Sequence, residues 1–223
     1  MTPFKTRLAG GVMLAVLSLG AAPAMAQDVE WPSYTADLAG SRYRPLDQIN
    51  ASNFSKLEVA WRFKTDSIGN RPEFKLAGTP LMVGGVIYAT AGSRRGVVAL
   101  DAATGELLWV HSEREGARGA AAPRQLSGRG LSYWSDGKQS RVLYVTPGYR
   151  LVALDAKTGQ RVADFGKAGE VDLKSDFDQE IDLVTGEVGL HAAPTVAGNT
   201  IIIGGAMHER SEERRVGKEC SLP

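Results

Sequence analysis

The chain contains 223 residues, of which 43% are hydrophobic and 23% charged, and its formal net charge at pH 7 is +1. These proportions are those of an ordinary globular protein, and the nearly balanced charge gives no electrostatic reason to expect a nucleic-acid-binding protein. The single cysteine, Cys220, lies close to the C-terminus, which excludes a disulfide framework or thiol chemistry in the remainder of the chain.

Residues 1–26 have the pattern of a secretory signal peptide. Lys5 and Arg7 form a positive region, Leu8–Leu19 is mostly apolar, and Ala24–Ala26 is a cleavage site of the small-x-small kind. The apolar run is short for a bilayer span. We therefore expect cleavage at the end of this segment, a periplasmic mature protein and no integral membrane segment in it. The alternative is an N-terminal membrane anchor.

Short β-type segments follow along the chain. Lys56–Asp66 is predicted to contain a strand. From Ala77 to His111, four short apolar or β-branched runs are separated by glycine-rich breaks that leave no room for crossover helices. A second set of four runs covers about Arg129–Phe165, and a third set begins at Ala192–Ala206. Each complete set predicts four antiparallel strands joined by hairpins.

One phrase occurs twice, as Val98–Gly105 and as Val152–Gly159, with a single difference between the two copies. The shared Asp-x-x-Thr-Gly predicts a hairpin, because the aspartate accepts backbone hydrogen bonds from the turn and the glycine adopts a positive φ. Asp182–Gly186 is predicted to be a third use of this device. Trp109, shortly after the first glycine, is suited to docking on the neighbouring unit.

Sequence units that recur along a chain are typical of repeat architectures. A four-stranded sheet cannot cover both of its own faces, whereas a radial arrangement buries each face against the next sheet. The predicted fold is therefore all-β, a β-propeller of four-stranded antiparallel blades with about three blades in this chain. A β-sandwich is the alternative that the strand pattern leaves open.

The last segment, 210–223, differs from the rest of the chain. Its dense charges follow no helical or strand period, and it resembles the translation of a common DNA sequencing adapter. We expect it to be a non-native tail that plays no part in the fold. The alternative is a solvated charged terminus.

The opening of the mature chain resembles one enzyme family. Trp31–Phe63 carries Trp-Pro-x-Tyr, Gly-x-Arg-Tyr, Pro-Leu-x-Gln-Ile-Asn and Leu-x-x-Ala-Trp in succession. This order is similar to that of the dehydrogenases that depend on pyrroloquinoline quinone (PQQ), of the alcohol and glucose type. Gly128–Trp134 resembles their cofactor-side segment, and the repeated phrase resembles their tryptophan-docking repeat. The resemblance extends over about Trp31–Glu209.

The resemblance implies an eight-bladed propeller in the complete family, with PQQ near the central axis beside a bound Ca²⁺ or lanthanide. Arg129 matches the arginine that binds a PQQ carboxylate, and a planar guanidinium suits that task. His191 falls where the family often has a Thr or Ser that touches the quinone. Glu209 matches a metal-coordinating carboxylate. From the residues alone, a surface arginine, a structural histidine and a chance glutamate are the respective alternatives.

The chain also departs from the family pattern. Ala77 stands where the family often has a Glu or Gln that contacts PQQ, and an adjacent cysteine pair of the methanol-type enzymes, which would fall near Pro123-Arg124, is absent. The family's catalytic aspartate lies in later blades. The resemblance therefore assigns no catalytic residue to this sequence.

We expect residues 27–209 to be the N-terminal part of a PQQ-dependent dehydrogenase that oxidises alcohols or sugars in the periplasm. The resemblance implies cytochrome c or ubiquinone as the electron acceptor, and the part encoded here is expected to be inactive by itself. The alternative is a non-catalytic propeller that acts as a scaffold for outer-membrane protein assembly. Such scaffolds share the docking phrase but have no need of the Gly-Arg-Gly segment.

Overall fold

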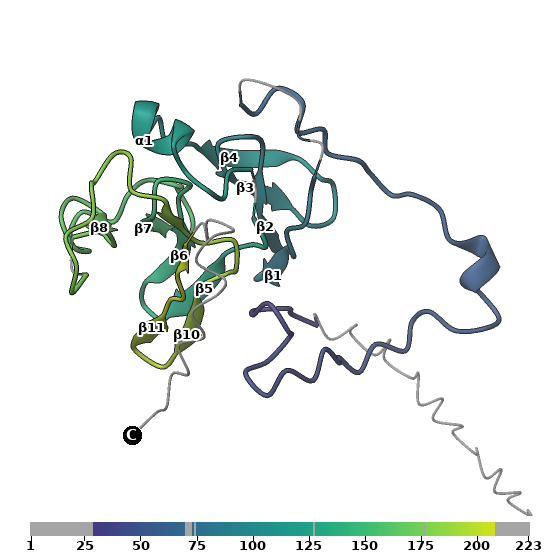
Figure 1. Cartoon of the computed structure of the whole chain (residues 1–223). Coiled ribbons are helices and arrows are strands. Elements are labelled where there is room, and N and C mark those ends of the chain that lie inside the picture. The colour runs from purple at the N-terminus through teal and green to yellow at the C-terminus, as the bar shows by residue number, and fades with distance from the viewer. Residues whose placement is uncertain (1–28, 70–72, 74, 127, 176, 208–223) are drawn as a thin grey trace, which may run out of the picture.

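The computed structural model describes residues 29–69, 73, 75–126, 128–175 and 177–207. The predicted signal peptide, the predicted tail and Glu209 lie outside these residues. Strands dominate, and the helices are a 3₁₀ turn at Phe54–Lys56 and α1 at Gly116–Ala120 (Figure 1). Within the described residues, no helix has the length and apolar character needed to cross a membrane.

Blade 1 confirms the first predicted set of four strands. Its strands are β1 (Leu81–Val83), β2 (Val86–Ala91), β3 (Gly96–Asp101) and β4 (Leu107–His111), antiparallel and adjacent in chain order. Short turns connect them because glycines supply the left-handed backbone that tight hairpins require. In the β1–β2 turn, Gly84 and Gly85 have φ values of 59° and 75°.

Blade 2 is a second four-stranded sheet, made of β5 (Ser132–Ser135), β6 (Ser140–Val145), β7 (Arg150–Asp155) and β8 (Glu170–Asp172). The expectation that this unit ends near Phe165 is wrong. The segment after the second hairpin phrase makes one isolated bridge, Leu154 with Arg161, and then turns away. The chain turns back through Gly166 and Gly169, both with positive φ, before the fourth strand forms.

The third unit is only partly built within the described residues. β10 (Thr195–Ala197) and β11 (Thr200–Ile202) form one antiparallel hairpin, and β9 (Val188–Gly189) pairs with β12 (Ala206–Met207). Strand β10 also lies against β5 of blade 2. The units thus follow one another in space as they do in sequence, which confirms a radial stack of antiparallel sheets.

The core lies between the blades, and alternate residues of one strand face opposite neighbours. In β6, Val142 and Tyr144 join the cluster that contains Leu81 and Tyr88 of blade 1. Leu143 and Val145 instead join the cluster formed with Val188 and Leu190 of the third unit. This alternation follows from the two-residue period of a strand. A sheet buried on both faces explains why the middle strands β3 and β7 are almost continuously apolar.

The hairpin phrase has the structure that its residues predict. Asp101 Oδ1 accepts hydrogen bonds from the backbone N–H groups of Ala103 (3.0 Å) and Thr104 (2.8 Å). Asp155 repeats these contacts in blade 2. Asp182 accepts the same kind of backbone bonds, so the aspartate turn recurs, but Gly186 lacks the positive φ and the turn joins no pair of described strands.

Each of the first two hairpins receives a tryptophan from the segment before it. Trp61 Nε1 donates to the Ala102 carbonyl at 3.1 Å, and Trp109 Nε1 donates to the Ala156 carbonyl at 3.0 Å. The rings lie against Gly105 and Gly159, so closely that a Cβ at either glycine would overlap them. Trp109 therefore docks on the neighbouring blade, as predicted, and Trp61 docks on blade 1 in the same manner.

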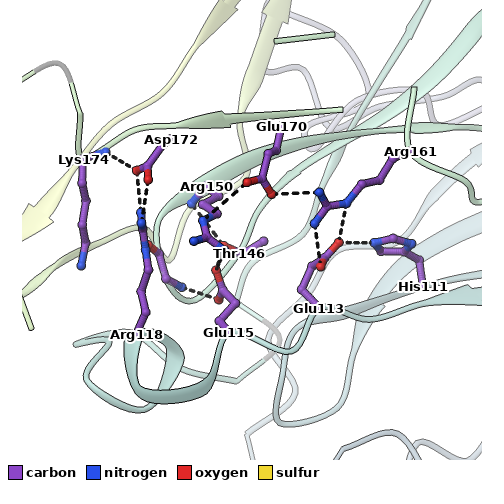
Figure 2. Close-up of polar contacts among 11 residues, drawn as sticks. His111, Glu113, Glu115, Arg118, Thr146, Arg150, Arg161, Glu170, Asp172 and Lys174 are labelled. Atoms are coloured by element: carbon purple, nitrogen blue, oxygen red, sulfur yellow. Dashed lines mark hydrogen bonds and ion pairs between the residues drawn. The ribbon is translucent and has the colours of Figure 1, made fainter. Parts of the chain in front are cut away.

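Charged contacts also join blade 1 to blade 2 (Figure 2). Glu113, just after β4, accepts hydrogen bonds from Arg161 at 2.9 Å and pairs with His111 at 2.6 Å. Arg118 of α1 forms a bidentate pair with Asp172 of β8, at 2.7 and 2.6 Å. Bidentate pairs have a defined geometry, so these contacts fix the orientation of the inter-blade connection as well as adding attraction.

Glu115 extends this network into the β6–β7 turn. Its carboxylate accepts hydrogen bonds from the Thr146 hydroxyl and the Gly148 N–H, each at 2.7 Å. The Arg150 guanidinium lies 3.8 Å from the same carboxylate and 3.8 Å from Glu170 (Figure 2). The connection between the blades is thus tied to the edge of blade 2 at several points.

Candidate functional site

Three distant segments meet at the Gly128-Arg129-Gly130 loop, which leads into blade 2. The Thr79 N–H donates to the Arg129 carbonyl at 3.0 Å, and the Arg129 N–H donates to the His191 carbonyl at 2.8 Å. Thr79 also forms a parallel bridge with Gly130. The backbone therefore brings together Arg129 and His191, the two predicted cofactor-binding residues within the described part of the chain.

The two glycines of this loop allow the close approach of the three segments. Gly128 has a φ of 68° and Gly130 a φ of 134°, values that residues with a Cβ rarely adopt. A Cβ on Gly130 would lie 3.1 Å from the Thr79 carbonyl oxygen. The Arg129 side chain, between them, is exposed to solvent. Gly-Arg-Gly is thus a device that presents one guanidinium from a tightly constrained backbone.

The electrostatic surroundings of the loop are positive. Burial lowers the pKa of the half-buried His191 imidazole below its ordinary value, and neighbouring cations lower it further. Those cations are, in order of effect, Arg95, Arg129, Arg124 and Lys75. The imidazole is therefore neutral at pH 7, and the cluster around it favours the binding of an anion.

Arg95 is the member of this cluster that sequence analysis did not find. It is 2% exposed, in the turn between β2 and β3, and burial lowers its pKa to about 10. In the sequence it stands in Ser-Arg-Arg-Gly, which reads as an exposed turn. Arg95 is buried because the linker before Arg129 and the segment before His191 pack around this turn.

One cavity near this end of the blades does not contain the predicted residues. It has a volume of about 680 Å³ and lies beside α1, with Arg94, Glu113, Arg114 and Glu115 among its lining residues. Neither Arg129 nor His191 lines it. The candidate site is therefore the convergence of the three backbone segments and their charges, outside this cavity.

The predicted metal ligand cannot be placed, because Glu209 lies outside the described residues. Within the ranges that the structure describes, no group of three or more His, Cys, Asp or Glu side chains is arranged to hold a metal ion. Ala77, which stands where the family often has a Glu or Gln, is exposed. The described site is therefore a cationic one without a set of metal ligands.

Comparison with known proteins identifies the family. Residues 31–219 match the PQQ family described as "Glucose/ethanol/alcohol dehydrogenase, beta-propeller domain". The chain belongs to this family of PQQ-type β-propellers. It is 34% identical over 223 residues to a quinate/shikimate dehydrogenase (quinone) of Acinetobacter baylyi, a match that covers 91% of this chain and 27% of that protein.

Two further comparisons agree with this assignment. The chain is 43% identical over 136 residues to the dehydrogenase subunit of an alcohol dehydrogenase (quinone) of Gluconobacter oxydans, covering 60% of this chain and 16% of the relative. Its fold is similar to that of the quinohemoprotein alcohol dehydrogenase of Comamonas testosteroni, with a TM-score of 0.60 and 27% identity over 80% of this chain and 23% of that one. The chain thus spans about a quarter or less of these relatives.

The residues at the Gly-Arg-Gly loop fit the carboxylate end of a PQQ molecule. An exposed guanidinium held by a constrained backbone can form two hydrogen bonds to a carboxylate. The surrounding cations offset the charge of an anionic ligand. The donor set is one that an anion requires, and it contains no acidic side chain that would oppose such a ligand among the residues acting on His191.

Proposed function

We propose that this chain forms part of the quinone-binding side of a periplasmic PQQ-dependent dehydrogenase that oxidises the hydroxyl group of an alcohol or a sugar. The observation that carries the proposal is the backbone junction at which Arg129 and His191 meet within a cationic cluster. PQQ, when bound, supplies the redox chemistry by accepting the two electrons of the substrate.

The residues of this chain would bind and orient the cofactor. Arg129 grips a carboxylate through two parallel hydrogen bonds, and its glycine neighbours limit the movement of the loop. His191 is neutral at pH 7, so its ring can donate or accept a hydrogen bond without adding a charge. No described residue is assigned to proton removal, and the catalytic base belongs to a part of the enzyme outside the described residues.

The proposal also includes a metal ion, an electron acceptor and a cellular location. Glu209 would provide one oxygen ligand to Ca²⁺ or a lanthanide. Cytochrome c or ubiquinone would receive the electrons, and residues 1–26 would direct export to the periplasm. A non-catalytic scaffold, the alternative from the sequence, is not favoured by the comparisons, because the relatives described above are quinone-dependent and quinohemoprotein dehydrogenases.

We also propose that this chain is the first portion of a longer ring. Trp61 docks on blade 1 as Trp109 docks on blade 2. The extended backbone around Trp61 therefore corresponds to the outer strand of another blade. Leu57 and Val59 are 53% and 65% exposed, and no strand partner for this segment is found within the described residues. The inner strands of that blade would come from the remainder of the protein.

Cofactor titration of the full-length protein tests the proposed function. We expect PQQ with Ca²⁺ or a lanthanide to raise the melting temperature, because a ligand that binds only the folded state stabilises it. A hundredfold excess over Kd corresponds to about 2.7 kcal/mol. The absence of any shift at saturating PQQ with either metal would overturn the proposal.

A further inference from the structure

Arg95 has an unusual position for a charged residue. It ends the turn between β2 and β3 with a φ of 52°, and its side chain is 2% exposed. A buried guanidinium is costly unless hydrogen bonds replace its lost water. Its neighbours show how the structure meets this requirement.

All of the hydrogen-bond acceptors found for this guanidinium are backbone carbonyl oxygens. Nε donates to Leu126 at 3.0 Å and Nη2 to Arg124 at 2.9 Å. Nη1 donates to Val145 at 2.9 Å and to Leu190 at 2.6 Å. These carbonyls belong to the linker before the Gly-Arg-Gly loop, to the end of β6 and to the residue before His191. One side chain therefore joins three segments that are far apart in sequence.

Arg95 also lies directly beneath the loop that carries Arg129. A Cβ built on Gly128 would lie 3.1 Å from Arg95 Nε and 3.2 Å from its Cζ. The same Cβ would be 3.3 Å from the His191 carbonyl oxygen, which accepts the Arg129 N–H. The backbone of both predicted cofactor-binding residues thus packs on one planar group.

We propose that Arg95 is a positioning residue of the quinone site, holding the linker before Arg129 and the segment before His191 in the arrangement that binds the cofactor carboxylate. This inference rests on the proposed function. Arg95 need not touch the cofactor, because its hydrogen bonds go to the backbone that sets the places of both side chains.

The charge of Arg95 acts in the same direction as its geometry. Its four hydrogen-bond acceptors are neutral carbonyls, and the nearby carboxylates of Glu115 and Glu73 offset part of the positive charge. Among the cations that lower the pKa of His191, Arg95 has the largest effect. A buried charge is weakly screened by salt, so Arg95 adds a lasting attraction for an anionic ligand.

Arg95→Lys in the full-length protein separates the two contributions. Lysine keeps the charge but has no planar fork and cannot reach carbonyls on several sides. We expect the Kd for PQQ, measured by fluorescence titration of the metal-loaded apoprotein, to rise about tenfold or more, as expected when hydrogen bonds to a charged group are lost. The absorption spectrum of the bound quinone should also change.

Arg118→Lys is the matched control. Arg118 is 5% exposed, donates to the Gly148 carbonyl at 2.6 Å and pairs with Asp172. Its replacement should lower the melting temperature of the apoprotein while leaving the Kd for PQQ within twofold. An equal loss of PQQ affinity in both variants would overturn the inference, since it would reflect general destabilisation.

Gly128→Ala provides a second variant in case Arg95→Lys does not fold. The added methyl group would displace the Arg95 guanidinium. Gly84→Ala is its control, because Gly84 has a similar φ of 59° and a Cβ there meets nothing within 4 Å. We expect only Gly128→Ala to weaken PQQ binding. Unchanged affinity in the Arg95 and Gly128 variants would refute the positioning role, whereas failure of the wild-type protein to bind PQQ would refute the proposed function itself.

Discussion

Arg129 and Arg95 differ in exposure, and this difference determines what each can contribute to the site. Arg129 is exposed and available to a ligand, whereas the Arg95 N–H groups already donate hydrogen bonds to backbone carbonyls. The sequence points to Arg129 only through the resemblance of its Gly-Arg-Gly segment to the family, because the residues alone are equally those of a surface arginine. It could not predict Arg95, because the burial of that side chain depends on the Leu190 and Val145 carbonyls, which are remote in sequence.

At the residue scale, we predict that Arg129→Lys weakens PQQ binding without loss of stability. Lysine offers a point charge in place of a guanidinium that can form two parallel hydrogen bonds. We expect the binding free energy to weaken by about 1.5–3 kcal/mol, which raises the Kd roughly tenfold to a hundredfold. Isothermal titration of the full-length protein measures this change. The melting temperature of the apoprotein should stay within about 1 °C because Arg129 is exposed. An unchanged Kd would contradict the assignment.

A second residue-scale prediction concerns the inter-blade carboxylate of Glu113. The hydrogen bond from His111, followed by those from Arg161, lowers the pKa of Glu113 from 4.5 to about 2. Because the pKa is lower in the folded state, its contribution to stability is present above pH 4.5 and is lost as the pH falls toward 2. Glu113→Gln should therefore flatten the dependence of the melting temperature on pH in this range. Equal pH dependence in both proteins would contradict the pairing.

At the scale of the element, the hairpin phrase is the part of the fold that the sequence predicts best. Asp101, Thr104 and Gly105 make their contacts within one turn, so local sequence is sufficient to specify them. The fourth strand of blade 2 differs from its expected position before Phe165, because its place depends on contacts that are not local in sequence. Arg161 begins to pair with β7, but Gly166 and Gly169 redirect the chain, and β8 is selected by pairing across the sheet.

The docking of a tryptophan on a glycine gives an element-scale prediction. A Cβ at Gly159 would overlap the Trp109 ring, and the residue has a φ of 69°. We expect Gly159→Ala to destabilise the protein by about 2–4 kcal/mol, from backbone strain and overpacking together. Chemical denaturation measures the loss. Gly137→Ala, with a φ of 86° and open space around its Cβ, should show the strain alone. Equal losses in the two variants would refute the docking.

On the scale of the whole molecule, the described chain is a stack of blades whose first and last members each lack a complete neighbouring sheet. The third unit is incomplete within the described residues, and the extended segment around Trp61 packs against blade 1 without pairing with a described strand. The sequence predicts the radial stacking because each apolar strand alternates between two partners. It does not specify the further blades that we propose, because the packing of this chain defines only the faces that such blades would cover.

Ring closure leads to a whole-molecule prediction. In the full-length protein, Trp61→Ala should destabilise the fold by about 3–5 kcal/mol, as expected for a large aromatic side chain in a packed interface. Trp109→Ala is the internal comparison, because both indoles donate to a hairpin carbonyl of the next blade. Thermal denaturation measures both losses. A negligible effect of Trp61→Ala beside a large effect of Trp109→Ala would show that the segment before blade 1 is a loose arm.

The direction of the tryptophan contacts has a consequence for biosynthesis. Trp61 is received by a hairpin that comes later in the chain, and Trp109 by one later still. During translation, each tryptophan leaves the ribosome before the hairpin on which it docks, so its indole stays uncovered until that hairpin has been synthesised. Maturation of such a protein therefore proceeds from the N-terminus onward, and the earliest blade depends on residues that are synthesised after it.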